Sequence, residues 1–116
     1  MITGLNLDET QDYVLKGDTE NPTVWKLGAI PSYIFSKIFS SAKQEDTDTL
    51  FKVLQVGLRG WENYAVEFKR EKKSFLGFDI EIVPLEILGS IPIPHVAEIA
   101  KKIIDINQIV EQERKN

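Results

Sequence analysis

The last quarter of the chain constrains the fold most, because apolar residues recur there at helical spacing. In residues 94–111 they follow one another at intervals of three and four, which places them on one face of a helix. A proline at position 94 suits the first turn of such a helix. The stripe consists of Val96, Ile99, Ala100, Ile103, Ile106 and Val110, and Ile104 and Ile109 widen it. We therefore predict a long helix over 94–111 that buries this face.

Two shorter segments show the same period. The first, over about 32–42, begins at Pro31 or Ser32. The second, over about 47–59, follows "QEDTDT", in which Asp46 or Thr47 can cap the helix. Gly60 is placed to be the left-handed residue that stops this second helix. The apolar residues of the two stripes are Ile34, Phe35, Ile38, Phe39 and Ala42 in the first, and Leu50, Phe51, Leu54 and Leu58 in the second.

Two regions alternate between polar and apolar residues, as strands do. Within 12–28, the runs 13–16 and 23–27 flank "GDTENP", whose residues favour turns, so we predict a small hairpin. In 64–82, "YAVEF" and "FDIEI" surround the charge run "KREKKS". This region is either a second, charged hairpin or a mobile loop with a short helix.

These elements predict an α+β fold that is mainly α, with three main helices, an N-terminal β-hairpin and the second hairpin at 64–82 as an open alternative. At 116 residues the chain is expected to form one domain over 1–116, with 1–11 as a loose segment. Trp61 follows the second helix, and we expect it to pack, together with Trp25, against the end of that helix. A contact with a ligand or partner is the other reading of Trp61.

Charge and composition exclude several classes of protein. The formal net charge of -4 disfavours a nucleic-acid binder, which needs a basic face for phosphates. No apolar run approaches the length of a membrane span, and the acidic N-terminus lacks the basic and apolar parts of a signal peptide. The absence of cysteine is compatible with a reducing cytosol. We expect a soluble protein that contacts neither nucleic acid nor membrane.

No motif in the sequence combines the residue types that are typical of a catalytic site. His95 is the one histidine, and we expect it to lie at the surface near a helix start. "QEDTDT" lacks the glycine and the final glutamate of a calcium loop, and "GLRG" is not a dinucleotide fingerprint. The sequence therefore predicts a non-catalytic protein with no cofactor and no metal.

Taken in order, several motifs resemble a family of small proteins encoded in the structural gene clusters of tailed bacteriophages. They are "NPTVWKLG", then Gly57–Leu58–Arg59–Gly60–Trp61–Glu62–Asn63, then the C-terminal "EQERKN". Members of this group are often assigned as tail assembly chaperones. The resemblance implies a protein that binds apolar helical segments of a tape-measure protein in the host cytoplasm. The alternative is a structural component retained in the virion, such as a head–tail connector, decoration protein or tail accessory protein.

Either role implies other phage structural proteins as partners, and a homo-oligomer would cover apolar surface that remains exposed. Two groups of residues are the candidate contacts, although the first can equally be core and the second a solvated loop. They are the apolar residues Ile34, Phe35, Ile38 and Phe39, and the basic residues Lys69, Arg70, Lys72 and Lys73. Trp25, Gly57, Gly60 and Trp61 are expected to be structural.

Overall fold

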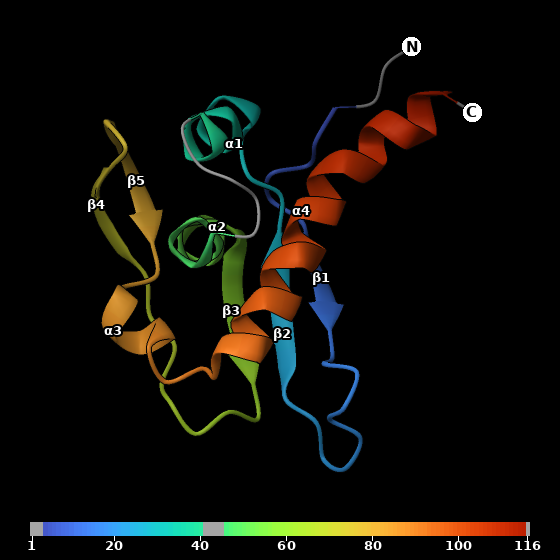
Figure 1. Ribbon diagram of the computed structural model, residues 1–116, viewed down its shortest axis with the longest axis vertical. Coiled ribbons are helices and arrows are strands. Elements are labelled where there is room, and N and C mark those ends of the chain that lie inside the picture. The colour runs from blue at the N-terminus through green and yellow to red at the C-terminus, as the bar shows by residue number, and fades with distance from the viewer. Residues whose placement is uncertain (1–3, 41–45, 116) are drawn as a thin grey trace.

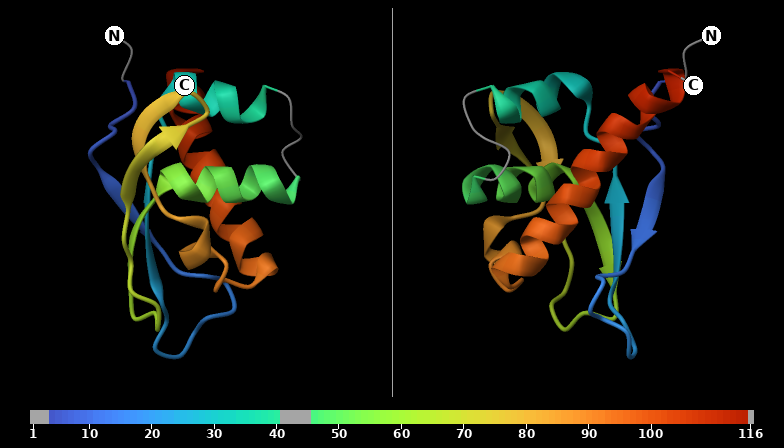
Figure 2. Two further views of the ribbon diagram at one scale, coloured as in Figure 1. Left: turned by 90° about the vertical axis from the view of Figure 1, so that its left-hand side faces the viewer. Right: turned by 45° about the vertical axis from the view of Figure 1, so that its right-hand side comes forward.

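The computed structural model describes residues 4–40 and 46–115, and these form an α+β domain with two separate antiparallel sheets (Figure 1). The described residues form five strands as well as four helices, so the prediction of a mainly α fold is wrong. In Figure 2 the strands gather on one side of the domain, and the longer helices pack against them from the other side. The strands are β1 (Thr10–Tyr13), β2 (Val24–Gly28), β3 (Leu58–Glu62), β4 (Glu71–Phe75) and β5 (Phe78–Ile82), and the helices are α1 (Ser32–Phe39), α2 (Thr47–Gly57), α3 (Leu85–Leu88) and α4 (Ile93–Lys115).

The larger sheet has the order β1-β2-β3, with β2 in the centre. The alternation in β2 is confirmed, because Trp25 and Leu27 are buried while Val24 and Lys26 are only half-buried. The predicted first strand was placed at 13–16, whereas β1 spans Thr10–Tyr13 and includes part of the segment expected to be loose. Its register, with Tyr13 opposite Trp25, is set by pairing with β2 and not by its own weak apolar pattern.

The third strand was not predicted, and it replaces the end of the second predicted helix. Asp46 caps α2 as expected, accepting a hydrogen bond from the backbone N–H of Asp48 at 3.2 Å. The helix ends at Gly57, and Leu58 is already extended. Gly60 lies within β3 opposite Lys26, and of the described glycines only Gly77 has a positive φ. Gly60 is therefore not a left-handed helix stop. Pairing with β2 ends the helix two residues before its predicted end at 59.

Gly57 allows α2 to approach α4 closely. A Cβ atom at this position would lie 2.5 Å from Cγ2 of Ile103, a separation that real Cβ atoms essentially never show. The long C-terminal helix begins one residue before its predicted start and buries Val96, Ile99 and Ile103 against this crossing. The predicted stripe is confirmed for these residues. The side chains of Ile109 and Val110, and residues 41–45 after α1, lie outside what the structure describes.

Two structures were considered for residues 64–82, a hairpin or a loop with a short helix, and the hairpin is the one that forms. Strands β4 and β5 pair antiparallel through a two-residue turn, in which Leu76 and Gly77 have φ values of 52° and 89°. Two positive φ values are what the tight hairpin turn requires. The hairpin begins at residue 71 rather than 64. Directly after it, Gln55 of α2 and Val83 exchange two hydrogen bonds, which hold the hairpin to the helix.

The core lies between the larger sheet and the helices. It contains the buried residues of the three predicted helical stripes and the buried faces of β2 and β3. Asn107 of α4 reaches across to the connection between β2 and α1, donating to the carbonyl of Ile30 at 2.8 Å and accepting from its N–H at 3.3 Å. The side chains with the least exposed area are Trp25, Leu27, Ile30, Ile34, Leu54, Leu58, Leu88, Ile99 and Ile103, with Val53, Val83 and Val96.

Candidate functional site

Helix α1 divides the predicted apolar contact residues into two pairs. Ile34 and Ile38 are almost fully buried, with 1% and 2% of their area exposed, and belong to the core. They are therefore not available to a partner, and their inclusion in a contact surface was wrong. Phe35 and Phe39 are half-buried on the neighbouring side of the helix, and their ring centroids are 4.8 Å apart. Only this second pair reaches the surface.

The two phenylalanines line an open groove between α1 and α4, which we call the α1–α4 groove. Its volume is about 380 Å³, and its other lining residues are Ser36, Ser40 and Gln108. The last turns of α4 continue beyond the body of the domain on this side (Figure 1). The groove therefore combines two aromatic rings with hydroxyl and amide groups that can form hydrogen bonds.

The basic residues 69–73 do not form one patch. Lys69 and Lys73 lie 3.6 and 3.0 Å from the carboxylate of Glu71, and Lys72 is exposed. The hydrogen bond from Lys73 is the largest cause of a lowered pKa at Glu71. Arg70 turns away from the three lysines, and only 21% of its side chain is exposed. The predicted cluster is thus three lysines at the surface and one arginine directed inward.

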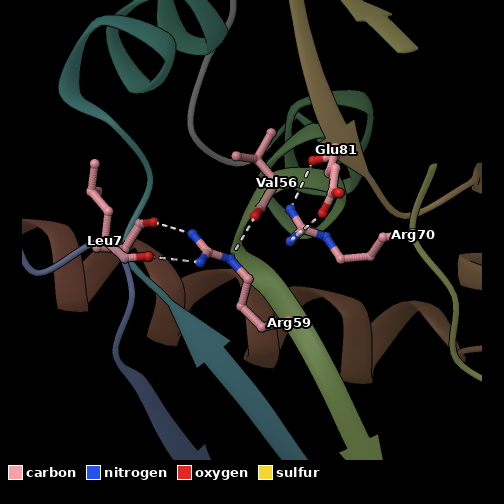
Figure 3. Close-up of polar contacts among 6 residues, drawn as sticks. Leu7, Val56, Arg59, Arg70 and Glu81 are labelled. Atoms are coloured by element: carbon pink, nitrogen blue, oxygen red, sulfur yellow. Dashed lines mark hydrogen bonds and ion pairs between the residues drawn. The ribbon is translucent and has the colours of Figure 1, made fainter. Parts of the chain in front are cut away.

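Arg70 meets Arg59 of β3 at a second, smaller pocket, which we call the arginine pocket (Figure 3). Arg59 donates from Nε to the carbonyl of Val56 at 3.2 Å and from Nη1 to that of Leu7 at 3.0 Å. Its Nη2 donates to the carbonyl of Ala29. Three backbone carbonyls therefore hold this guanidinium, and none of the carboxylates in residues 4–40 and 46–108 forms an ion pair with it.

Space for Arg59 comes from a glycine on the adjacent strand. A Cβ atom at Gly28 would lie 2.8 Å from Cζ of Arg59, within the volume that the guanidinium occupies. Its position at the end of the predicted second helix gave no sign that Arg59 is a site residue, so it was not predicted as one. The arginine and this glycine are far apart in sequence, so only recognition of 58–62 as a strand next to β2 could have linked them.

Arg70 is held more loosely than Arg59. Its Nη2 donates to the carbonyl of Glu81 at 2.7 Å, and its Nη1 lies 3.8 Å from the Glu81 carboxylate. Its Nε is buried and has no hydrogen-bond partner among the described residues. Burial is the main cause of a lowered pKa at both arginines, and the positive charge of Arg70 lowers the pKa of Arg59 further.

Of the four residues predicted to be structural, Trp25, Trp61 and Gly57 make close packing contacts, whereas Gly60 lies within β3 with room for a side chain. Trp25 and Trp61 face each other across β2 and β3, with ring centroids 5.6 Å apart. The Trp61 indole N–H donates to the carbonyl of Val66 at 2.7 Å. The predicted contact between the two tryptophans is confirmed. It lies within the sheet, because Trp61 is a strand residue and does not fold back on α2.

His95 is exposed, as predicted. Within the described part of the chain, no group of three or more histidine, cysteine or acidic residues is placed to hold a metal ion, and no helix there has the length and apolar character to cross a membrane.

Comparisons of the chain with protein-family models, with curated proteins and with solved structures found no match.

Proposed function

We propose that this protein is a non-catalytic assembly factor of a tailed bacteriophage, and that it acts as a tail assembly chaperone. The resemblance of "NPTVWKLG" and "GLRGWEN" to that group is one support. The observation that carries the proposal is the α1–α4 groove, where Phe35 and Phe39 remain half-exposed beside a long helix. Its partner is an apolar helical segment of the tape-measure protein.

The groove suits a single large apolar side chain of such a segment. At about 380 Å³ it lies at the small end of the range for binding pockets. A helix that lies in a groove is recognised through anchor residues one turn apart, and the adjacent, mutually tilted rings of Phe35 and Phe39 provide the contact surface for one anchor. The serine hydroxyls and Gln108 would form hydrogen bonds at its edge.

A structural role in the virion is the second candidate, and the β4–β5 hairpin favours it. The hairpin stands at the side of the molecule (Figure 1) and exposes Lys69, Lys72 and Lys73. An arm with several lysines suits a neighbouring acidic subunit. In this role the protein would be a homo-oligomer held by repeated contacts in the particle, whereas a chaperone would remain in the host cytoplasm.

Quantitative mass spectrometry of mature virions and infected-cell lysate distinguishes the two roles. A chaperone is expected in the lysate and absent from purified particles. A constant copy number that matches a ring or capsid symmetry would contradict the chaperone assignment and support the structural one.

A variant tests the groove itself. Phe39→Ser should reduce co-purification of the tape-measure protein from the same gene cluster, because it removes half of the aromatic surface. Leu85→Ser is the matched control, since Leu85 is also apolar and 55% exposed but lies on α3, outside the groove. Equal co-purification with both variants, each folded by circular dichroism, would reject the groove as the contact site.

A further inference from the structure

Two arginines from different parts of the fold line one pocket, although neither is needed there to neutralise a buried carboxylate. Arg59 comes from β3 and Arg70 from the segment just before β4. The pocket has a volume of about 190 Å³. Like charges at one site repel each other, and burial increases the cost. Such an arrangement is typical of sites that bind an anion, which offsets both effects.

The positive charge of Arg59 has only partial compensation. Carbonyl dipoles occupy three of its five N–H groups, so one hydrogen on each Nη remains to donate. Asp8 is near enough to raise its pKa slightly against the effect of burial, but it forms no ion pair with Arg59. The side chain is also fixed in place, because Gly28 leaves room for it and three carbonyls hold it.

Arg70 supplies the donor that has no partner. A buried N–H without a hydrogen bond is costly and uncommon in folded proteins, and the Nε of Arg70 is such a group within the described structure. The contact with Glu81 is loose at 3.8 Å, and 65% of the Glu81 side chain is exposed. A carboxylate bound in the pocket would therefore compete only with an exposed carboxylate for Arg70.

Apart from the two arginines and the carboxylate of Glu81, the pocket lining is apolar, and this limits the kind of anion that it can accept. A phosphate or sulfate ion needs donors around all of its oxygens, whereas a carboxylate needs them on one side only. The planar fork of an arginine matches the two oxygens of a carboxylate. The accessible apolar residues of the lining would contact the group attached to that carboxylate, and they are Leu7, Pro31 and Ile80, with the buried side chains of Ile34 and Val56 behind them.

We propose that the arginine pocket binds a carboxylate carried on a short apolar group. Arg59 and Arg70 bind the carboxylate, and the apolar side chains enclose the group behind it. This chemistry occurs in a free small acid and in the last residue of a protein chain that ends in an aliphatic side chain. The inference does not depend on the proposed function, because the pocket and the α1–α4 groove share no lining residue.

The direct test is a nuclear magnetic resonance titration of the full chain that observes the arginine Nε–H signals. Sodium isovalerate should shift the signals of Arg59 and Arg70 with saturation. Isovaleramide, which has the same shape without the charge, and sodium chloride at equal ionic strength should not. If isovaleramide or chloride causes the same shifts, the pocket does not recognise a carboxylate and the proposal is wrong.

The source of the carboxylate is determined with a short peptide that ends in leucine, compared with its C-terminal amide. Tighter binding of the free-acid peptide than of isovalerate would assign the site to a chain end. Binding of isovalerate with exclusion of the peptide would assign it to a small acid. Failure of both ligands to bind would overturn the proposal, and it would leave the α1–α4 groove unaffected.

Three variants test the geometry. Arg70→Gln should weaken isovalerate binding about tenfold or more, as expected for a lost hydrogen bond to a charged group. Glu81→Gln should tighten it about two- to fivefold, because an exposed competing carboxylate is removed. Lys72→Gln, which removes an exposed charge on the same hairpin, is the control. If Lys72→Gln weakens binding as much as Arg70→Gln, or if Glu81→Gln does not tighten it, the carboxylate is not held between these arginines.

Discussion

At Gly57 the last turn of α2 touches α4 so closely that a methyl group has no room. The Cβ position lies 2.5 Å from Cγ2 of Ile103, a buried side chain that cannot swing into solvent. Gly60, three residues later, has a different environment: its nearest contact would be Cγ of Lys26 at 3.5 Å, an ordinary distance. Two glycines of the same motif are therefore expected to respond differently to substitution.

Gly57→Ala should lower the free energy of unfolding by about 1–3 kcal/mol, the usual cost of overpacking a core. Gly60→Ala should change it by less than about 1 kcal/mol, because its φ is not positive and a Cβ atom fits there. Urea denaturation measures both values. In an Ile103→Ala background the cost of Gly57→Ala should largely disappear, and an undiminished cost would show that the contact is not its cause.

Trp61 contributes to stability through an aromatic cluster and not through a helix cap. Its ring lies 5.6 Å from Trp25, 5.0 Å from Tyr64 and 4.9 Å from Phe68, measured between centroids. Trp61→Ala should cost about 3 kcal/mol, at the low end for a large aromatic side chain because Trp61 is only half-buried. Thermal unfolding checks this, and an unchanged melting temperature with weakened partner binding would indicate a contact role instead.

At the scale of elements, a pair of hydrogen bonds joins the edge strand β1 and the following turn to α4. The Tyr13 hydroxyl donates to a carboxylate oxygen of Glu98 at 2.6 Å, and the N–H of Lys16 donates to the same oxygen at 2.9 Å. The bond from Tyr13 is the largest cause of a lowered pKa at Glu98. Burial and the bond to Glu98 raise the pKa of Tyr13 to about 12.

This link makes stability depend on pH at the acidic end. Glu98 has a folded-state pKa below its ordinary value of 4.5, so its contribution is present above that value and is lost as the pH falls. Glu98→Gln should therefore destabilise the protein at neutral pH, and the difference should shrink progressively as the pH falls below 4.5. Glu67→Gln, a substitution of an exposed glutamate, is the control. A constant difference between Glu98→Gln and the parent protein at all pH values would exclude the ionised carboxylate as the cause.

At the basic end, the hydrogen bond between Tyr13 and Glu98 makes stability fall as the pH rises. A raised folded-state pKa at Tyr13 means that its contribution is complete below the ordinary value of 10.0 and is lost as the pH rises towards about 12. Tyr13→Phe, which cannot ionise or donate, should flatten this part of the stability curve. Denaturation at increasing pH measures it, and parallel curves for the two proteins would contradict the assignment.

At the scale of the molecule, the sequence predicted the elements whose local pattern is strong. The α4 stripe, the Asp46 cap and the β2 alternation each depend on residues close together in the chain. β3 could not be predicted in this way, since Leu50, Leu54 and Leu58 fit one helical face. Residues 58–62 become a strand because β2 offers them backbone partners, and β2 lies far away in sequence.

The candidate sites show the same difference between features that depend on neighbouring residues and features that depend on distant segments. Of the four apolar candidates only Phe35 and Phe39 reach the surface, because helical spacing shows which residues share a stripe but not which edge of it stays at the surface. The arginine pocket was not predicted, since it joins Arg59, Arg70 and the space beside Gly28 from three separate segments. Only the folded sheet brings these segments together.

The contact between the two tryptophans has a practical consequence for spectroscopy. Both indoles of the chain lie at one point of the larger sheet, so intrinsic fluorescence reports on that point alone. Opening of the β4–β5 hairpin or fraying of the distal turns of α4 would leave the emission spectrum almost unchanged. Coupling between the two indole transitions should, however, give a near-ultraviolet dichroism signal that disappears when β2 and β3 separate. Disagreement between this signal and helical ellipticity during denaturation would reveal that the two layers unfold independently.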